Sequence, residues 1–170
     1  GFKYRGPIDG HDLGLLIKTL NDLKSYHCPI LLHVLTKKGK GLDLAQKDPL
    51  TYHDGFPTTS SDPIPKKYQD VFAEELILIA NENKNVVAVT AAMATGTGIS
   101  KFQEIHPDKC FDVGIAEQHG VSFCAGMANQ GKIPFMAIYS TFLQRAIDQI
   151  FQEWSLQGKA LHGVFCMDRA

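Results

Sequence analysis

The sequence VVAVT at Val86–Thr90 and the sequence IPFMAIY at Ile133–Tyr139 decide the fold class. Both runs are apolar almost throughout and do not alternate with polar residues, which is the pattern of strands that are covered on both faces. Segments with the helical spacing of apolar residues lie between and after them. The pattern therefore predicts an α/β fold, in which a parallel sheet has helices on both faces.

The neighbouring segments continue this alternation. We expect helices at residues 68–83, 99–105 and 116–129, and a further helix that Ser140 caps. Short strands are expected at residues 110–113 and 163–167. The apolar stripes of the first and last of these helices are expected to be Phe72, Leu76, Ile79 and Ala80, and Leu143, Ile147, Ile150 and Trp154.

The first fifty residues form a region of a different kind. A helix is expected at residues 12–24 with Asp12 as its cap, and a buried strand at residues 29–36, whereas residues 1–4 show no helix or strand start. Residues 43–66 lack periodicity and accumulate prolines. We therefore expect one domain at residues 1–50, a linker at 51–67 and a second domain at 68–170. Because the first residue is Gly1, the chain is expected to begin inside a longer protein.

The composition excludes several classes of function. The 170 residues carry 17 basic and 18 acidic side chains, so neither nucleic acid nor a membrane surface is expected as a partner. No apolar run approaches the ~20 residues that cross a bilayer. The seven histidines and four cysteines lack the spacing of a zinc site, so we expect no metal held by this chain and reduced cysteines in the core.

Three segments follow predicted strand ends, where ligands of parallel α/β proteins bind. Residues 112–119 (DVGIAEQH) place Glu117 in the first turn of a helix, where the helix dipole favours a carboxylate. Residues 139–145 (YSTFLQR) offer a phenol, two hydroxyls, an aromatic ring and a guanidinium. Residues 90–98 (TAAMATGTG) form a glycine-containing loop that lacks the third glycine of a dinucleotide fingerprint.

Each segment also has a purely structural interpretation. Glu117 can be a helix-start residue that the dipole stabilises, and Phe142 can belong to the core. Arg145 can simply pair with Asp148, three residues on, or with Glu153. The residue types alone leave both interpretations open.

Six short sequence motifs, in a fixed order along the chain, indicate the family. They are GPIDGHD at residues 6–12, TKKGKG at 36–41, TAAM at 90–93, DVGIAEQH at 112–119, AIYSTFLQRA at 137–146 and DRA at 168–170. Together they resemble the 1-deoxy-D-xylulose-5-phosphate synthase family of transketolase-like enzymes, over nearly the whole chain. The resemblance implies a thiamine-diphosphate-binding fold that is incomplete here. Residues 1–50 would end the diphosphate-binding domain, and residues 68–170 would begin the pyrimidine-binding domain.

The resemblance also implies roles for individual residues. Glu117 would share a proton with N1′ of the cofactor's aminopyrimidine and so promote loss of the C2 proton, and His11 would be a second catalytic group that transfers protons. The ring of Phe142 would stack on the aminopyrimidine, and Ile115 and Met93 would complete the cofactor-binding set.

The acceptor and the metal have their own expected ligands. By resemblance, Tyr139, Arg145 and Arg169 would bind the phosphate of the substrate, to which a fork of guanidinium donors is suited. The Mg²⁺ that accompanies thiamine diphosphate would be held by a G-D-G…N segment outside this chain, so no metal ligand is expected among these residues.

The implied reaction is a two-carbon transfer. Pyruvate would be decarboxylated and the remaining unit joined to D-glyceraldehyde 3-phosphate, giving 1-deoxy-D-xylulose 5-phosphate for the isoprenoid, thiamine and pyridoxal routes. The resemblance further implies a homodimer in the bacterial cytoplasm, or in the stroma if the source is a plant, and an isolated chain without activity. The alternatives are another transketolase-like enzyme, such as a transketolase or the β-subunit of a 2-oxoacid dehydrogenase, and a non-catalytic assembly module.

Overall fold

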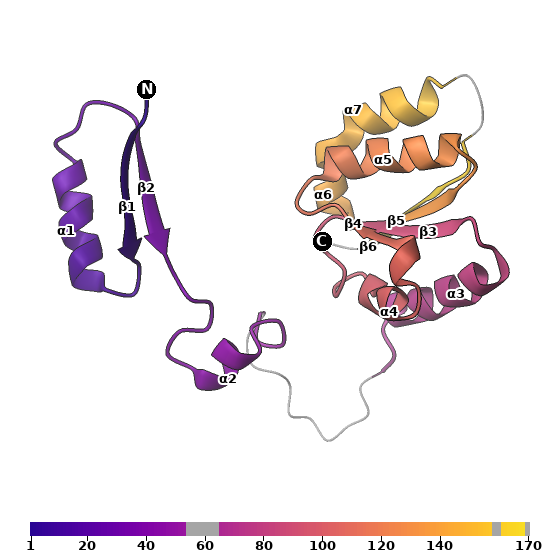
Figure 1. Cartoon of the computed structure of the whole chain (residues 1–170), viewed down its shortest axis with the longest axis horizontal. Coiled ribbons are helices and arrows are strands. Elements are labelled where there is room, and N and C mark those ends of the chain that lie inside the picture. Colours follow the sequence, from indigo (N-terminus) through magenta and orange to yellow (C-terminus); the bar gives the residue numbers. More distant parts are fainter. Residues whose placement is uncertain (54–64, 158–160, 169–170) are drawn as a thin grey trace. The chain divides into compact units, whose positions relative to one another are not determined.

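The computed structural model describes residues 1–53, 65–157 and 161–168 (Figure 1). By its internal contacts the chain divides into two compact units, Gly1–Pro63 and Ile64–Ala170. Most of the linker expected at residues 51–67 lies outside the described residues, so the proposed domain limits stay a prediction.

The first unit is a two-stranded parallel sheet with helices. Its elements are β1 (Lys3–Asp9), α1 (Leu13–Leu23), β2 (Ile30–Leu35) and α2 (Asp43–Lys47). The expected cap of α1 is confirmed, because an Asp12 carboxylate oxygen accepts a hydrogen bond from the backbone N–H of Leu15 at 2.9 Å. Such a bond satisfies one of the N–H groups that the first turn of a helix leaves without a partner.

Three expectations for this unit are wrong. A strand begins at Lys3 although its sequence KYRGPID is mostly polar, because β2 supplies the ladder hydrogen bonds that the sequence does not signal. The β2 strand is not buried, since its side chains alternate between half-buried and exposed, and Leu31 is 57% exposed in this chain. The short helix α2 lies where we expected no regular structure.

The second unit confirms the parallel α/β fold. Its strands are β3 (Val86–Thr90), β4 (Cys110–Asp112), β5 (Ile133–Tyr139) and β6 (Val164–Asp168), and they pair in the order β4-β3-β5-β6, all parallel. Its helices are α3 (Tyr68–Glu82), α4 (Ile99–Ile105), α5 (Glu117–Asn129), α6 (Ser140–Leu143) and α7 (Ile147–Gln149), with 3-10 turns at Pro107–Lys109 and Gln144–Ala146 and a π-helical segment at Ile150–Ser155. Among the described helices, none has the length and apolar composition that crossing a bilayer requires.

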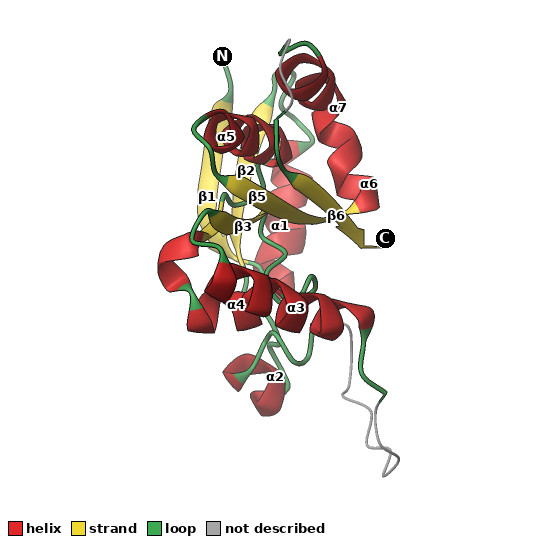
Figure 2. Cartoon of the chain, turned by 90° about the vertical axis from the view of Figure 1, so that its right-hand side faces the viewer, coloured by secondary structure: helices red, strands yellow, loops and turns green. Residues whose placement is uncertain are grey.

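The chain reverses its direction across this sheet after β4. The β4 strand lies on one side of β3 and β5 lies on the other. Because crossovers between parallel strands are right-handed, such a reversal moves the next helix to the opposite face. Figure 1 shows α3 and α4 on one face of the sheet and α5, α6 and α7 on the other, and Figure 2 shows the same layers from the side. The loops after β3 and β5 therefore diverge, which is where ligands bind in such sheets.

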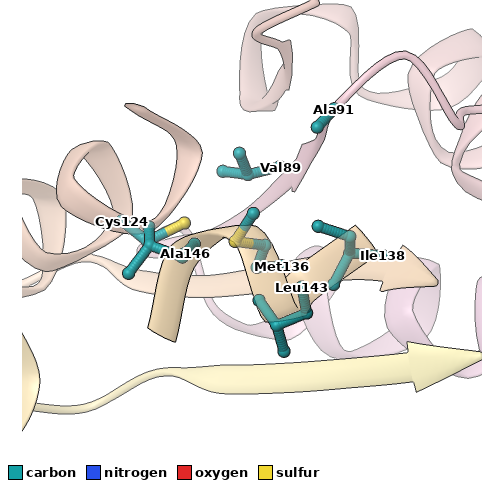
Figure 3. Close-up of a cluster of buried hydrophobic side chains, with 8 residues drawn as sticks. Val89, Ala91, Cys124, Met136, Ile138, Leu143 and Ala146 are labelled. Carbon is teal, nitrogen blue, oxygen red and sulfur yellow. The ribbon is translucent and has the colours of Figure 1, made fainter. Parts of the chain in front are cut away.

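Each face of the sheet carries its own core, because successive side chains of a strand point to opposite faces. On the α5 side the buried cluster is Val89, Ala91, Val121, Cys124, Met136, Ile138, Leu143 and Ala146 (Figure 3). On the α3 and α4 side it is Leu76, Ala80, Val86, Ala88, Ile99, Phe102 and Ala137. All five residues of β3 are buried, which explains its uninterrupted apolar sequence.

Two expected apolar stripes need correction. Ile79 is exposed, and so is Ile147, with 65% of its surface accessible. Ser140 caps nothing, since it is the first residue of α6 and β5 runs directly into this helix. The 3-10 turn that follows brings residues three apart into line, so Ala146 rather than Ile147 joins Leu143 in the core.

Candidate active site

Glu117 is a buried carboxylate at the carboxyl end of the sheet. The β4 strand ends at Asp112, the chain turns at Gly114 with a φ of +71°, and α5 begins with Glu117. Only 4% of the Glu117 side chain is exposed. Because a buried charge needs polar partners, this position is more than a solvated helix start.

The partner of Glu117 is Arg145. The guanidinium Nη1 donates to Oε2 of Glu117 at 3.1 Å, and the side chain of Arg145 is 57% exposed. Arg145 makes this ion pair across 28 positions of sequence rather than with Asp148 or Glu153, the partners that spacing alone offered. The segments after β4 and β5 are thus joined by a charge-assisted hydrogen bond.

Asp112 joins the segments after β3 and β4. Its Oδ1 accepts hydrogen bonds from the backbone N–H of Ala92 at 2.7 Å and of Gly114 at 2.9 Å. Ala92 has a left-handed φ of +59°, so the loop after β3 turns sharply at this contact. Sequence reasoning gave Asp112 no role, although an aspartate two residues before a glycine is a known signal of a side-chain-stabilised turn.

Met93, Tyr139 and Phe142 lie together across the loops after β3 and β5. The backbone N–H of Tyr139 donates to Sδ of Met93 at 3.4 Å. The rings of Tyr139 and Phe142 are stacked with their centroids 6.0 Å apart. Three of the residues expected at the site are therefore in one cluster.

The glycines of the loop after β3 are explained by packing. A Cβ on Gly96 would lie 1.8 Å from the Tyr139 hydroxyl oxygen, so this phenol rests directly on the loop. Gly98 has a φ of +80°, and a Cβ there would lie 2.4 Å from the carbonyl oxygen of Gln69 in α3. Close approach of neighbouring groups, rather than a phosphate, accounts for the TGTG sequence.

Exposed apolar side chains precede both members of the ion pair in the sequence. Ile115, two residues before Glu117, is 76% exposed, and Phe142, three residues before Arg145, is 48% exposed. Apolar surface next to a few convergent polar groups is typical of a site for a flat, partly polar ligand.

The other expected site residues are His11, in the first unit, and Arg169. Ring Nε2 of His11 accepts a hydrogen bond from the backbone N–H of Lys37 at 2.7 Å, within the first unit. Arg169 lies outside the described residues. Within the described ranges, no group of three or more His, Cys, Asp or Glu side chains is arranged to hold a metal ion.

A pocket of about 210 Å³ is lined by residues of α3, of the loop after β3 and of the strands β5 and β6. Its lining includes Gln69 and Phe72 of α3, Thr97, and Met167 of β6, but neither Glu117 nor Arg145. The ion pair of Glu117 and Arg145 is thus not part of the lining of this pocket.

Comparison with known proteins identifies relatives for both units. A family model described as the transketolase pyrimidine-binding domain matches residues 65–168, and one described as 1-deoxy-D-xylulose-5-phosphate synthase matches residues 1–36. The 1-deoxy-D-xylulose-5-phosphate synthases of Thermomicrobium roseum and Synechocystis are 50% and 51% identical over the whole chain. The chain spans 27% and 28% of the length of these relatives. A solved split-gene transketolase, an inactive beta4 tetramer, is 30% identical, with a TM-score of 0.46 over 51% of this chain and 29% of that one.

Proposed function

Since the chain belongs to the 1-deoxy-D-xylulose-5-phosphate synthase family of transketolase-like, thiamine-diphosphate-dependent enzymes, we propose that it forms part of such a synthase. The whole enzyme decarboxylates pyruvate and joins the two-carbon unit to D-glyceraldehyde 3-phosphate. Its product, 1-deoxy-D-xylulose 5-phosphate, feeds isoprenoid, thiamine and pyridoxal synthesis. One observation carries the proposal: the Glu117 carboxylate is buried at the carboxyl end of a parallel sheet, beside exposed apolar side chains.

The residues of the site fit an aminopyrimidine ring. Arg145 occupies Oε2 of Glu117, and in the part of the chain that the structure describes no donor reaches Oε1. This oxygen can meet the N1′ edge of the ring. The exposed side chains of Phe142 and Ile115 suit the flat faces of the same ring. Tyr139 contacts both Met93 and Phe142, which brings Met93 into the same cluster as Phe142.

The protein's own part in the reaction is proton transfer and orientation. When bound, thiamine diphosphate supplies the nucleophilic carbon and accepts the electrons that decarboxylation releases. Glu117 holds or moves the proton at N1′, and its burial keeps water from competing for that hydrogen bond. His11 is the proposed second proton-transfer group. Its Nε2 accepts a hydrogen bond from the backbone N–H of Lys37, and this bond must break before Nε2 can transfer a proton.

Substrate and assembly complete the proposal. Tyr139, Arg145 and Arg169 bind the phosphate of the acceptor, since planar guanidinium donors match phosphate oxygens. Mg²⁺ and the diphosphate are held by residues beyond this chain. By family resemblance, we also propose a cytoplasmic homodimer.

The experiment replaces Glu117 by glutamine in the full-length protein. The amide keeps the shape of the side chain but cannot share the proton, so exchange of the cofactor's C2 proton should slow on the order of 10²–10⁴-fold. The exchange is followed by NMR after acid quench. The dissociation constant for thiamine diphosphate should change far less, because the diphosphate contacts are untouched.

A matched change tests whether the effect is specific to this position. Glu104→Gln alters an exposed glutamate of α4, on the other face of the sheet, and should exchange at the parental rate. If Glu117→Gln also exchanges at the parental rate, then Glu117 is only a helix-start residue and the proposed role is wrong.

A further inference from the structure

The ion pair of Glu117 and Arg145 joins two residues to which the proposed function gives separate tasks. The guanidinium has five N–H donors. One of them, on Nη1, donates to the Glu117 carboxylate. Because the Arg145 side chain is 57% exposed, its other N–H groups can still donate to a ligand. We propose that Arg145 is a positioning residue that holds the Glu117 carboxylate in its working orientation before any substrate binds. This inference rests on the proposed function.

The backbone on both sides of the pair is anchored in one core. Val121 and Cys124 of α5 are buried in the same cluster as Leu143 and Ala146, which flank Arg145 (Figure 3). The 3-10 turn aligns Leu143 with Ala146 toward that core. Arg145, which lies between them, is therefore turned outward and toward the first residue of α5. Packing on this shared core sets the distance between the two backbones.

The helix dipole favours a carboxylate at Glu117, the first residue of α5, but among the described residues Arg145 is the donor that reaches this carboxylate. Its side chain has three rotatable bonds, and a carboxylate without donors is strongly disfavoured in a buried position. Without the guanidinium, we expect the carboxylate to rotate toward solvent or to take up a proton, and either change disturbs the proton that it would share with N1′.

The positioning role predicts an effect that phosphate binding alone does not. If Arg145 served only the acceptor, its loss would be felt only when D-glyceraldehyde 3-phosphate is present. A residue that orients Glu117 also acts on the C2 proton exchange, which needs no substrate. One guanidinium then couples the acceptor end of the site to the proton-transfer end.

The test uses Arg145→Met in the full-length protein, because methionine retains much of the aliphatic length without charge or donors. In the absence of pyruvate and acceptor, C2 proton exchange should fall on the order of 10- to 100-fold, as expected for an ångström-scale misplacement of a catalytic group. The dissociation constant for thiamine diphosphate, measured by calorimetry, should stay within a few-fold of the parental value. Arg145→Lys should restore part of the exchange rate but not the KM for the acceptor, since lysine keeps one donor and loses the fork.

The control is Lys101→Met. It removes the cation of another ion pair, between Lys101 and Asp70 at 2.8 Å, on the α3 and α4 face of the sheet. This variant should exchange at the parental rate. If Arg145→Met does not fold, Arg145→Gln takes its place under the same criterion.

Two failures can be told apart. Parental exchange in the Arg145 variant, with only the KM for the acceptor raised, overturns the positioning role and leaves the proposed function intact. Absence of cofactor binding or C2 proton exchange in the unaltered protein overturns the proposed function itself.

Discussion

Gly98, the residue directly before α4, lies where the neighbouring helix leaves no space for a side chain. Its φ of +80° is left-handed, and an added Cβ would lie 2.4 Å from the Gln69 carbonyl oxygen of α3. Gly131 has a similar φ of +83°, but a Cβ there would meet nothing within 4 Å. Replacing each glycine by alanine therefore separates backbone strain from steric overlap. We predict that Gly98→Ala destabilises the second unit considerably more than Gly131→Ala.

The magnitude follows from two contributions. Both variants place an L-residue in the left-handed region, at a cost of about 1–2 kcal/mol. At Gly98 the methyl group also overlaps a backbone oxygen, which no side-chain rotation can relieve, so α4 must move off α3. A forced shift of well-packed elements costs about 1–3 kcal/mol more, and this is the expected difference between the variants. For a unit of this size, each kcal/mol lowers the melting temperature by roughly 4–8 °C.

The assay uses the chain's single tryptophan. Trp154 lies in the second unit, where its Nε1 donates to the Val121 carbonyl oxygen at 3.3 Å, so its fluorescence reports the unfolding of that unit. Melting curves of the two variants and the unaltered chain are compared. Equal melting temperatures for Gly98→Ala and Gly131→Ala would refute the close approach of α4 to α3.

Three further predictions concern the site and the thiols. Gly96→Ala displaces the Tyr139 hydroxyl that contacts this glycine. The KM of the full-length protein for D-glyceraldehyde 3-phosphate, measured by steady-state kinetics, should therefore rise several-fold or more. An unchanged KM would contradict this. The isolated 170-residue chain should form no 1-deoxy-D-xylulose 5-phosphate by mass spectrometry, because the proposed diphosphate anchor is missing; product formation would refute this. Burial raises the pKa of the Cys124 thiol to about 12, so alkylation at pH 8 should modify the half-buried Cys28 before Cys124. The alkylation rate of Cys124 should rise with pH, because the thiolate is the nucleophile. Equal alkylation rates of Cys28 and Cys124 at pH 8 would disprove the burial of Cys124.

The elements that sequence reasoning predicted well have an apolar pattern that burial explains, on both faces of the strands β3 and β5 and on one face of the helix α4. The limits expected for Val86–Thr90, Ile133–Tyr139 and Ile99–Ile105 agree with the structure at both ends. Each has turn-forming or polar neighbours, and the two strands have no competing helical period. The parallel direction of the strands followed from the same pattern.

The features that were missed depend on partners distant in sequence. The polar strand β1 exists because β2 pairs with it, and nothing in the residues Lys3–Asp9 reports that pairing. The ion pair of Glu117 and Arg145 could not be found by spacing, because it depends on how α5 and the 3-10 turn pack on one core. Local periodicity carries no information about such contacts.

The position of β3 in the sheet has a consequence for synthesis on the ribosome. This strand is made before both of its neighbours, and its partner Ile133 in β5 follows Val86 by 47 residues. Until β5 has been made, one edge of a fully buried strand stays open, which is the kind of surface on which nascent chains aggregate. The contacts of Met93 with Tyr139 and of Glu117 with Arg145 form only after β5 has paired with that edge. A growing chain that has not reached Arg145 thus has the Glu117 carboxylate without its guanidinium and an unpaired strand edge, the kind of surface that chaperones cover.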